Sequence, residues 1–400
     1  MRKKVISVVL ILVYILNFSF MLSSNGESQI TFDTIDEMKD YLDSLNSDTD
    51  AVNIVKPELN VNVRSCVLME ASTGTVLYEV NKDEKLPPAS VTKVMTLLLI
   101  MEAIDNGNIS FEDQVTTSEH AASMGGTQIY LEVGETMTVD ELIKAIAVPS
   151  ANDATVAMAE YLAGSEEEFV RRMNERAKEL GMNSTNFTCC TGLFDDDNHV
   201  TSAYDIAVMT RELLKHPKIL SYTTIWMDTL RDGGFGLANT NKMLRTYSGM
   251  NGMKTGYTKK SMYCFSGTAE RDGMTLIATV MGSPTSQDRF AATAKMLDFG
   301  FSGFSVVKAS PEAQQPIKVN KGKVDTVPIE VVGGLTLLVG KGQEKLITSE
   351  ISIADSVDAP IEKGTEVGTL TYKLKDEVVQ TCPIIASETV PKATFIDYFG

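Results

Sequence analysis

Residues 87–108 of the chain read PPASVTKVMTLLLIMEAIDNGN. The apolar run 91–104 stops at a Gly-containing polar segment, which predicts a buried helix. Lys93 is the single basic residue of the stretch, and a charged side chain at the start of a buried helix requires a specific role. Ser90 lies three residues earlier, on the same face of a helix. The stretch therefore predicts a serine and a lysine in contact at the N-terminus of a core helix.

This pair suits nucleophilic catalysis. A serine hydroxyl is a weak nucleophile until a base takes its proton, and a lysine acts as that base where burial or a second cation lowers its pKa. The helix N-terminus adds backbone N–H groups and the positive end of a dipole, which stabilise an oxyanion. Alone, Ser-x-x-Lys is a weak signal because it arises by chance in many chains.

Two further motifs follow in the chain. Ser150-Ala151-Asn152 falls between two predicted helices, and taken alone it predicts an N-cap for the helix that begins near Asp153. Lys254-Thr255-Gly256 is either a turn with an exposed lysine or the entry to a strand beside the serine-bearing helix. In a strand, glycine permits the close approach of a ligand.

The elements around the motifs predict an α+β fold. Hairpins are expected at 64–80 and 262–281, the second around the turn 270–273. The predicted helices are 91–104, 139–147, 153–162, 166–180, 203–214 and 288–299. The order hairpin, helices, hairpin, helix differs from the regular alternation of a parallel sheet.

The last quarter of the chain lacks helical periodicity. Short β-like runs separated by glycine turns predict a small antiparallel all-β sandwich over 315–385. They are 327–332, 336–339, 345–351, 367–374 and 377–385.

The chain begins with a predicted export signal over residues 1–26. A basic head at residues 2–4, an apolar stretch and small residues at 23–26 are typical of such a signal. The protein is then extracytoplasmic, secreted or held at the cell surface or cell wall; if the segment is retained, it associates with the membrane. Residues 27–60 predict an acidic spacer, 61–305 a catalytic domain and 386–400 a tail.

Composition excludes several classes. Apolar residues make up 43% and charged residues 22% of the chain, which is ordinary for a globular protein. The net charge of −17 argues against nucleic acid as a partner, because such binding neutralises phosphates.

Five cysteines without a CxxC pair predict no structural zinc site, and the acidic run 195–199 predicts a solvated loop. No metal or cofactor is expected. Cys66 and Cys264 each lie in an apolar, strand-like run, which predicts buried thiols. A Cys66–Cys264 disulfide is the alternative.

Together the three motifs resemble the SxxK, S-x-N and K-T-G set of penicillin-binding proteins and class A β-lactamases. Additional stretches narrow the resemblance to the low-molecular-mass serine D-Ala-D-Ala carboxypeptidases. They are residues 88–96, 125–131, 150–154, 239–242 and 254–258. The resemblance covers 61–300 closely and 315–385 more loosely, and implies a β-lactamase/transpeptidase-like catalytic domain followed by a β-rich domain.

The resemblance implies an acyl-transfer mechanism on peptidoglycan stem peptides ending in D-Ala-D-Ala, with β-lactam antibiotics as covalent inhibitors. Ser90 would attack the carbonyl between the two terminal D-alanines. The other implied roles are Lys93 as general base, Ser150 as proton relay to the leaving D-alanine, Asn152 as a holder of Lys93 and the substrate amide, Lys254 and Thr255 as the carboxylate site, Gly256 as the open approach, and the N–H groups of Ser90 and Tyr257 as the oxyanion hole.

The chain departs from the family pattern at two places. Relatives often have Asn-Pro before Thr-Gly-Leu, whereas this chain has Cys189-Cys190 before Thr191. Relatives also often end in a basic amphipathic helix, which the tail 386–400, with one lysine and Pro391, does not predict.

Two alternatives remain open. A β-lactamase-type hydrolase needs a glutamate that activates the deacylating water. The segment 179–183, which begins with Glu179, resembles the loop that carries this glutamate, although Gly181 predicts that a helix ends there. A catalytically weak cell-wall binding protein would use the β-rich domain as its working part, but the intact catalytic motifs argue against it. A Ser-His-Asp hydrolase is not favoured because no GxSxG motif is present.

Overall fold

The computed structural model describes residues 20–22, 30–32, 59–193, 196–312 and 314–394. It contains two compact units, residues 1–53 and 54–400, which are considered separately. In the first, β1 (Phe20–Leu22) pairs with β2 (Ile30–Phe32) in antiparallel fashion. The expected signal and spacer otherwise lie largely outside the described residues. No helix in the described part of the chain is long and apolar enough to cross a membrane.

A five-stranded antiparallel sheet forms the centre of the part of the second unit that precedes residue 304. Its order is β4-β3-β11-β10-β9. The strands are β3 (Ser65–Glu70), β4 (Val76–Val80), β9 (Met250–Thr258), β10 (Met262–Arg271) and β11 (Met274–Ser283). Both predicted hairpins are confirmed. The tight turn between β10 and β11 has positive φ at Asp272 and Gly273, as a type I′ turn requires.

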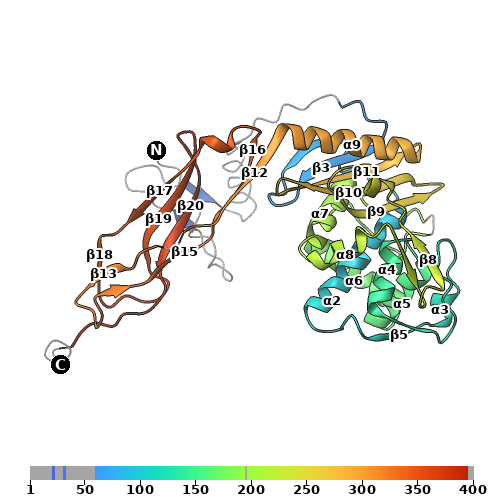
Figure 1. Ribbon diagram of the computed structural model, residues 1–400, viewed down its shortest axis with the longest axis horizontal. Coiled ribbons are helices and arrows are strands. Elements are labelled where there is room, and N and C mark those ends of the chain that lie inside the picture. The colour runs from blue at the N-terminus through green and yellow to red at the C-terminus, as the bar shows by residue number, and fades with distance from the viewer. Residues whose placement is uncertain (1–19, 23–29, 33–58, 194–195, 313, 395–400) are drawn as a thin grey trace. The chain divides into compact units, whose positions relative to one another are not determined.

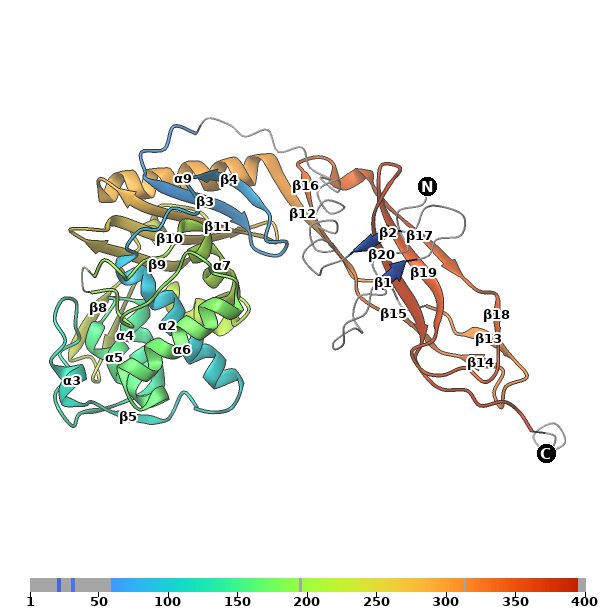
Figure 2. The ribbon, with the colours of Figure 1, turned by 180° about the vertical axis from the view of Figure 1, so that it is seen from behind.

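Helices cover both faces of this sheet (Figures 1 and 2). α9 (Ser286–Gly303) lies on one face, and a helical layer led by α7 (Ala203–Leu213) lies on the other. The rest of the layer includes α2 (Lys93–Asp105), α4 (Val139–Ala147), α5 (Asn152–Ala163) and α6 (Glu166–Glu179). All six predicted helices are present. α2 follows a long apolar run, and α4, α6, α7 and α9 have side-chain N-caps. Ser165, Ser202 and Thr285, for example, accept N-cap hydrogen bonds.

α2 is the predicted buried helix, and Leu97, Leu98 and Ile100 have no exposed surface. Its first turn differs from expectation, because Ala89–Thr92 form a 3₁₀ helix, η3, that precedes α2. A 3₁₀ turn eclipses side chains three residues apart. Ser90 and Lys93 therefore still share one face.

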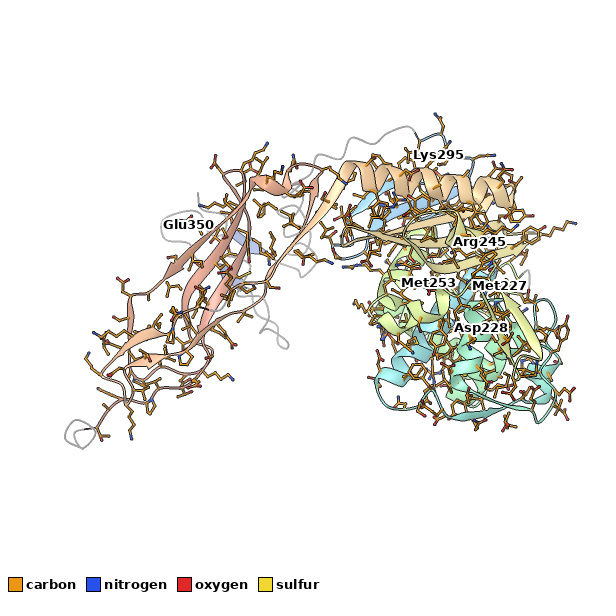
Figure 3. All side chains as sticks on the ribbon, in the orientation of Figure 1. Met227, Asp228, Arg245, Met253, Lys295 and Glu350 are labelled. Atoms are coloured by element: carbon orange, nitrogen blue, oxygen red, sulfur yellow. The ribbon has the colours of Figure 1, made fainter. Side chains whose placement is uncertain are left out.

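Several short elements were not predicted from the sequence, because helices and strands of three or four residues are too short to show a periodic pattern. They are β5 (Gln114–Thr116), α3 (Glu119–Ala122), β6 (Thr136–Thr138), η4 (Pro217–Ile219), α8 (Leu220–Thr223), β7 (Met227–Leu230), β8 (Phe235–Ala238) and η5 (Lys242–Arg245). The β7–β8 hairpin is held by Asp228, labelled in Figure 3, whose carboxylate lies 2.9 Å from Lys144 of α4.

The C-terminal region is β-structured, as predicted, apart from one 3₁₀ turn, η6 (Glu344–Leu346). Its largest sheet has the order β15-β20-β19-β17 and is antiparallel; Glu350 on β17, labelled in Figure 3, pairs with Lys373. The strands are β12 (Phe304–Ala309), β13 (Ile317–Asn320), β14 (Thr326–Val327), β15 (Ile329–Val331), β16 (Leu335–Gly340), β17 (Ile347–Ile353), β18 (Ser356–Asp358), β19 (Glu366–Leu374) and β20 (Glu377–Ala386). A wholly antiparallel arrangement was wrong, since β13 and β18 pair in parallel. In its described part, the tail forms isolated bridges such as Ile361 with Val390.

Candidate active site

Lys93 lies at the centre of a buried polar cluster. Its side chain has no exposed surface, and its Nζ lies 3.1 Å from Ser90 Oγ, 2.7 Å from Asn152 Oδ1 and 2.9 Å from the Thr191 carbonyl oxygen. Burial lowers the pKa of Lys93 to about 8, although nearby Cys190, Cys189 and Asp153 act in the opposite direction. The neutral amine is therefore accessible near physiological pH.

The three contacts of Lys93 match the valence of a neutral amine. Such an amine has two hydrogens to donate and one lone pair to accept with. The Asn152 and Thr191 oxygens can only accept and take both hydrogens. The lone pair is then left for the Ser90 hydroxyl, and this arrangement favours proton transfer from Ser90 to Lys93.

Ser150 does not cap α5, so that part of the sequence analysis was wrong. The N-cap is Ala151, which makes no side-chain cap bond. The backbone of Ser150 has a φ of +77°, a strained conformation for a residue with a β-carbon and one that recurs at functional sites. Its Oγ is buried and has no hydrogen-bond partner among the described residues. Asn152, two residues on, donates from Nδ2 to the Gly125 carbonyl.

β9 brings the third motif against the serine. A β-carbon on Gly256 would lie 2.8 Å from the Pro88 carbonyl oxygen and 3.0 Å from the Ser90 nitrogen. Only glycine therefore lets the strand approach η3 this closely, and the predicted strand beside the serine-bearing helix is present. Next to it, Thr255 Oγ1 donates to Thr240 Oγ1 at 2.6 Å. Tyr257 is 56% exposed, and its ring lies 4.4 Å from that of Tyr263.

Lys254 is buried, which contradicts a solvated turn lysine. Its Nζ donates to the Thr255 carbonyl at 2.9 Å, and within the described ranges no carboxylate forms an ion pair with it. Burial, with the like charges of Lys93 and Arg289, lowers its pKa well below the usual range. A carboxylate placed beside it would restore the charged form.

Some residues that support the site were missed. Arg289, in the first turn of α9, donates from Nη1 to the carbonyls of Gly256 and Cys264 at 3.1 Å each. Asp153 accepts the amides of Ile129 and Leu131. Asp153 adjoins the second motif and could have been found by its position, whereas nothing near Arg289 in the sequence predicts its contact.

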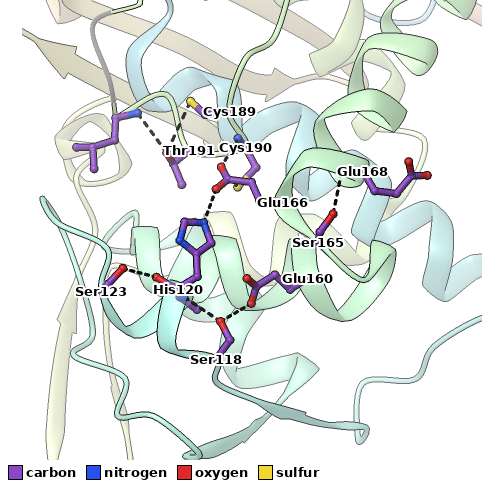
Figure 4. Close-up of polar contacts among 12 residues, drawn as sticks. Ser118, His120, Ser123, Glu160, Ser165, Glu166, Glu168, Cys189, Cys190 and Thr191 are labelled. Atoms are coloured by element: carbon purple, nitrogen blue, oxygen red, sulfur yellow. Dashed lines mark hydrogen bonds and ion pairs between the residues drawn. The ribbon is translucent and has the colours of Figure 1, made fainter.

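The Cys189-Cys190 pair is accommodated without distortion of the site. Cys189 Sγ accepts the Gly192 amide at 3.2 Å, a bond to a side-chain acceptor that asparagine also supplies in such turns. Figure 4 shows Glu166 reaching between His120 and Cys190: Oε1 accepts the Cys190 amide at 3.1 Å, and Oε2 lies 2.8 Å from His120 Nε2. These contacts hold the segment whose next carbonyl, that of Thr191, binds Lys93.

The structure also addresses the other sequence interpretations. All five cysteines are free and buried, so Cys66 and Cys264 form no disulfide. Glu179 is the last residue of α6, is 66% exposed in its side chain and pairs with Arg176, which confirms the helix-end interpretation. No group of three or more His, Cys, Asp or Glu residues in the described ranges is arranged to hold a metal ion.

Serine enzymes with a lysine one turn after the serine share this combination of sheet, buried helix and three motifs, and the protein is one of that class. It belongs to the D-alanyl-D-alanine carboxypeptidase family, whose pattern matches residues 51–285. Residues 301–392 match the C-terminal domain of penicillin-binding protein 5.

Individual relatives agree with this assignment. The chain is 47% identical to the D-alanyl-D-alanine carboxypeptidase DacF of Bacillus subtilis, over 85% of this chain and 89% of that one. Identity to DacC of Escherichia coli is 31%, over 84% and 86% of the two chains. Among solved structures, penicillin-binding protein 5 of Haemophilus influenzae gives a TM-score of 0.70 at 27% identity, over 85% of this chain and all of that one. Penicillin-binding protein D2 of Listeria monocytogenes, solved with ampicillin bound, gives 0.56 at 33% identity, over 61% and 100%.

Proposed function

We propose that the protein removes the terminal D-alanine from peptidoglycan stem pentapeptides through an acyl-enzyme on Ser90. The observation that carries this proposal is the contact of Lys93 Nζ with Ser90 Oγ at 3.1 Å, beside the acceptors Asn152 Oδ1 and Thr191 O. In the neutral amine these two acceptors take both hydrogens and leave the lone pair for the Ser90 hydroxyl. A serine needs such a base to become nucleophilic.

Acylation follows from these contacts. Lys93 takes the hydroxyl proton as Ser90 Oγ bonds to the carbonyl carbon between the two D-alanines. The amides of Ser90 and Tyr257 hold the resulting oxyanion. When the C–N bond breaks, the proton moves from Lys93 through Ser150 to the leaving amine; the Ser150 hydroxyl, which has no hydrogen-bond partner among the described residues, is available for this relay. In the second half, Lys93 takes a proton from water as the water oxygen bonds to the acyl carbon. The bond between that carbon and Ser90 Oγ then breaks, and Lys93 returns the proton to Ser90 Oγ.

Substrate selection is assigned to β9. An exopeptidase must distinguish a chain end from an internal bond, and the carboxylate is the chemical mark of that end. Lys254 would supply the charge and Thr255 a hydrogen bond, while Gly256 leaves the approach open. The burial of Lys254 without an acidic partner in the described residues supports this role, because buried charges are normally paired.

β-Lactams imitate the D-Ala-D-Ala end, and we expect them to acylate Ser90; the ampicillin complex of the Listeria relative supports this expectation. We further propose an extracytoplasmic location, a catalytic domain over 61–305 and a separate β-rich domain over 315–385. The N-terminal segment would add membrane association if it is retained.

The deciding experiment measures D-alanine release from a D-Ala-D-Ala pentapeptide by the purified protein and by Ser90→Ala. Wild type should release one D-alanine per peptide and the variant none. A fluorescent penicillin should form an adduct that mass spectrometry maps to Ser90. An adduct on another residue, or D-alanine release by Ser90→Ala, would overturn the proposal.

A further inference from the structure

His199 is a buried histidine that the proposed mechanism does not use. It is 2% exposed and its ring lies against Phe187. Nδ1 lies 3.0 Å from the Thr188 amide nitrogen, and Nε2 lies 2.7 Å from Thr92 Oγ1. Because an amide can only donate, Nδ1 accepts and carries no proton. The ring is then the neutral tautomer with its hydrogen on Nε2, which donates to Thr92.

Thr92 links His199 to η3, the turn that contains Ser90. Its hydroxyl accepts from His199, so its own hydrogen is free to donate to the Ala89 carbonyl oxygen, 2.8 Å away. Nδ1 of His199 also lies 3.4 Å from Thr188 Oγ1 and 3.9 Å from Cys189 Sγ. The series Thr188 amide, His199, Thr92, Ala89 carbonyl joins a donor to an acceptor at each step. It has one direction and leaves no group in it unsatisfied.

The end of this series is the peptide group that contains the Ser90 N–H. Ala89 has a φ of +50°, which side chains with a β-carbon avoid, so its conformation needs support from its surroundings. Gly192 supplies a second restraint, since a β-carbon there would lie 1.9 Å from the Ala89 oxygen. A peptide group is planar, and a carbonyl fixed at Ala89 therefore fixes the direction of the Ser90 N–H.

We propose that His199 is a positioning residue that acts through Thr92 to orient the Ala89–Ser90 peptide, so that the Ser90 N–H is aimed at the oxyanion. The inference rests on the proposed function, in which that N–H is an oxyanion donor. His199 touches neither Ser90 nor Lys93 in the described contacts, so it acts on geometry rather than as a base.

The test compares Thr92→Val with Thr92→Ser in the full chain. Valine keeps the shape but removes the hydroxyl, whereas serine keeps it. We expect Thr92→Val to slow acylation of Ser90 by a fluorescent penicillin about tenfold to a hundredfold, below the loss for complete removal of an oxyanion donor. Thr92→Ser should recover most of the rate. On a peptide substrate the loss should appear in kcat with KM nearly unchanged, since the oxyanion exists only in the transition state.

A matched control is Thr279→Val, which removes a buried hydroxyl that donates to the Ala203 carbonyl at 2.8 Å between β11 and α7. Its acylation rate should stay within about twofold of wild type. His199→Phe should slow acylation as Thr92→Val does. The double variant should be no slower than the slower single one, because both changes interrupt one series of bonds.

Three results would overturn the proposal: an unchanged rate in Thr92→Val, an equal loss in Thr92→Ser and Thr92→Val, or a shifted midpoint of the pH–rate profile in His199→Phe, which would make His199 a proton carrier. If His199→Phe does not fold, the two Thr92 variants still decide. Failure of wild type to acylate at Ser90 would instead reject the proposed function, so the two failures are distinguishable.

Discussion

Gly256 lies so close to Ser90 that a β-carbon on it would stand 3.0 Å from the Ser90 nitrogen. The neighbours at this distance are backbone atoms of the turn that carries the nucleophile, including the Pro88 carbonyl oxygen. They cannot move without moving Ser90. The separation of β9 from η3 is thus set by the missing side chain.

Gly256→Ala should therefore slow acylation by a fluorescent penicillin by about a hundredfold, since a displacement near 1 Å costs on that order. Overpacking of this kind also costs roughly 1–3 kcal/mol of stability. Gly303→Ala is the matched control, because a β-carbon at the end of α9 meets nothing within 4 Å. If a folded Gly256→Ala protein were acylated at the wild-type rate, β9 could move away from η3 without consequence for the reaction.

The pH dependence of acylation should report Lys93. The base must be neutral, and burial lowers the pKa of Lys93 to about 8. Below that pH the ammonium form dominates and the rate falls; above it the rate reaches a plateau. Acylation measured from pH 5 to 10 should rise with a midpoint near 8.

Asn152→Asp should move this midpoint to higher pH. The change is nearly isosteric, and it places a carboxylate where Asn152 Oδ1 lies 2.7 Å from Lys93 Nζ. An adjacent opposite charge stabilises the ammonium. An unshifted midpoint in a folded variant would mean that a different group controls the rate.

Glu179→Gln should leave acyl-enzyme breakdown within about twofold of wild type, because exposed substitutions usually change energies by about 0.5 kcal/mol or less. Glu175→Gln, on the same helix and also exposed, is the control. The measurement is loss of the labelled penicillin over time. If Glu179→Gln, but not Glu175→Gln, slowed acyl-enzyme breakdown by a hundredfold or more, the β-lactamase-type alternative would be restored.

The sequence predicted what local patterns encode. α4 has the predicted bounds, and its start follows from the capping box formed by Thr138 and Glu141. The Ser90–Lys93 contact follows from spacing alone. The hydrogen bonds of Arg289 to Gly256 and of His199 to Thr92 join residues far apart in the chain, and no local pattern contains them. The motif Ser150-Ala151-Asn152, taken alone, predicted a helix cap, because the positive φ of Ser150 is imposed by tertiary packing and leaves no local sequence signal.

Lys254 gives the sharpest test of substrate selection. A charge-assisted hydrogen bond to the terminal carboxylate contributes roughly 1.5–3 kcal/mol, or about ten- to a hundredfold in rate. Wild type should strongly prefer a free-acid peptide ending in D-Ala-D-Ala over its C-terminal amide. Lys254→Gln should lose most of that preference by losing activity on the acid alone.

The comparison of kcat/KM for the two peptides separates recognition from chemistry. The like charge of Lys93 contributes to the lowered pKa of Lys254; a Lys254 held in its charged form by the substrate carboxylate would in turn disfavour the ammonium form of Lys93. If Lys254→Gln lowers kcat/KM equally for both peptides and raises the midpoint of the pH–rate profile, then the role of Lys254 is to lower the pKa of Lys93. Carboxylate recognition would then belong to other groups. If kcat/KM for the amide peptide is unchanged and the midpoint stays near 8, Lys254 binds the terminal carboxylate of the peptide.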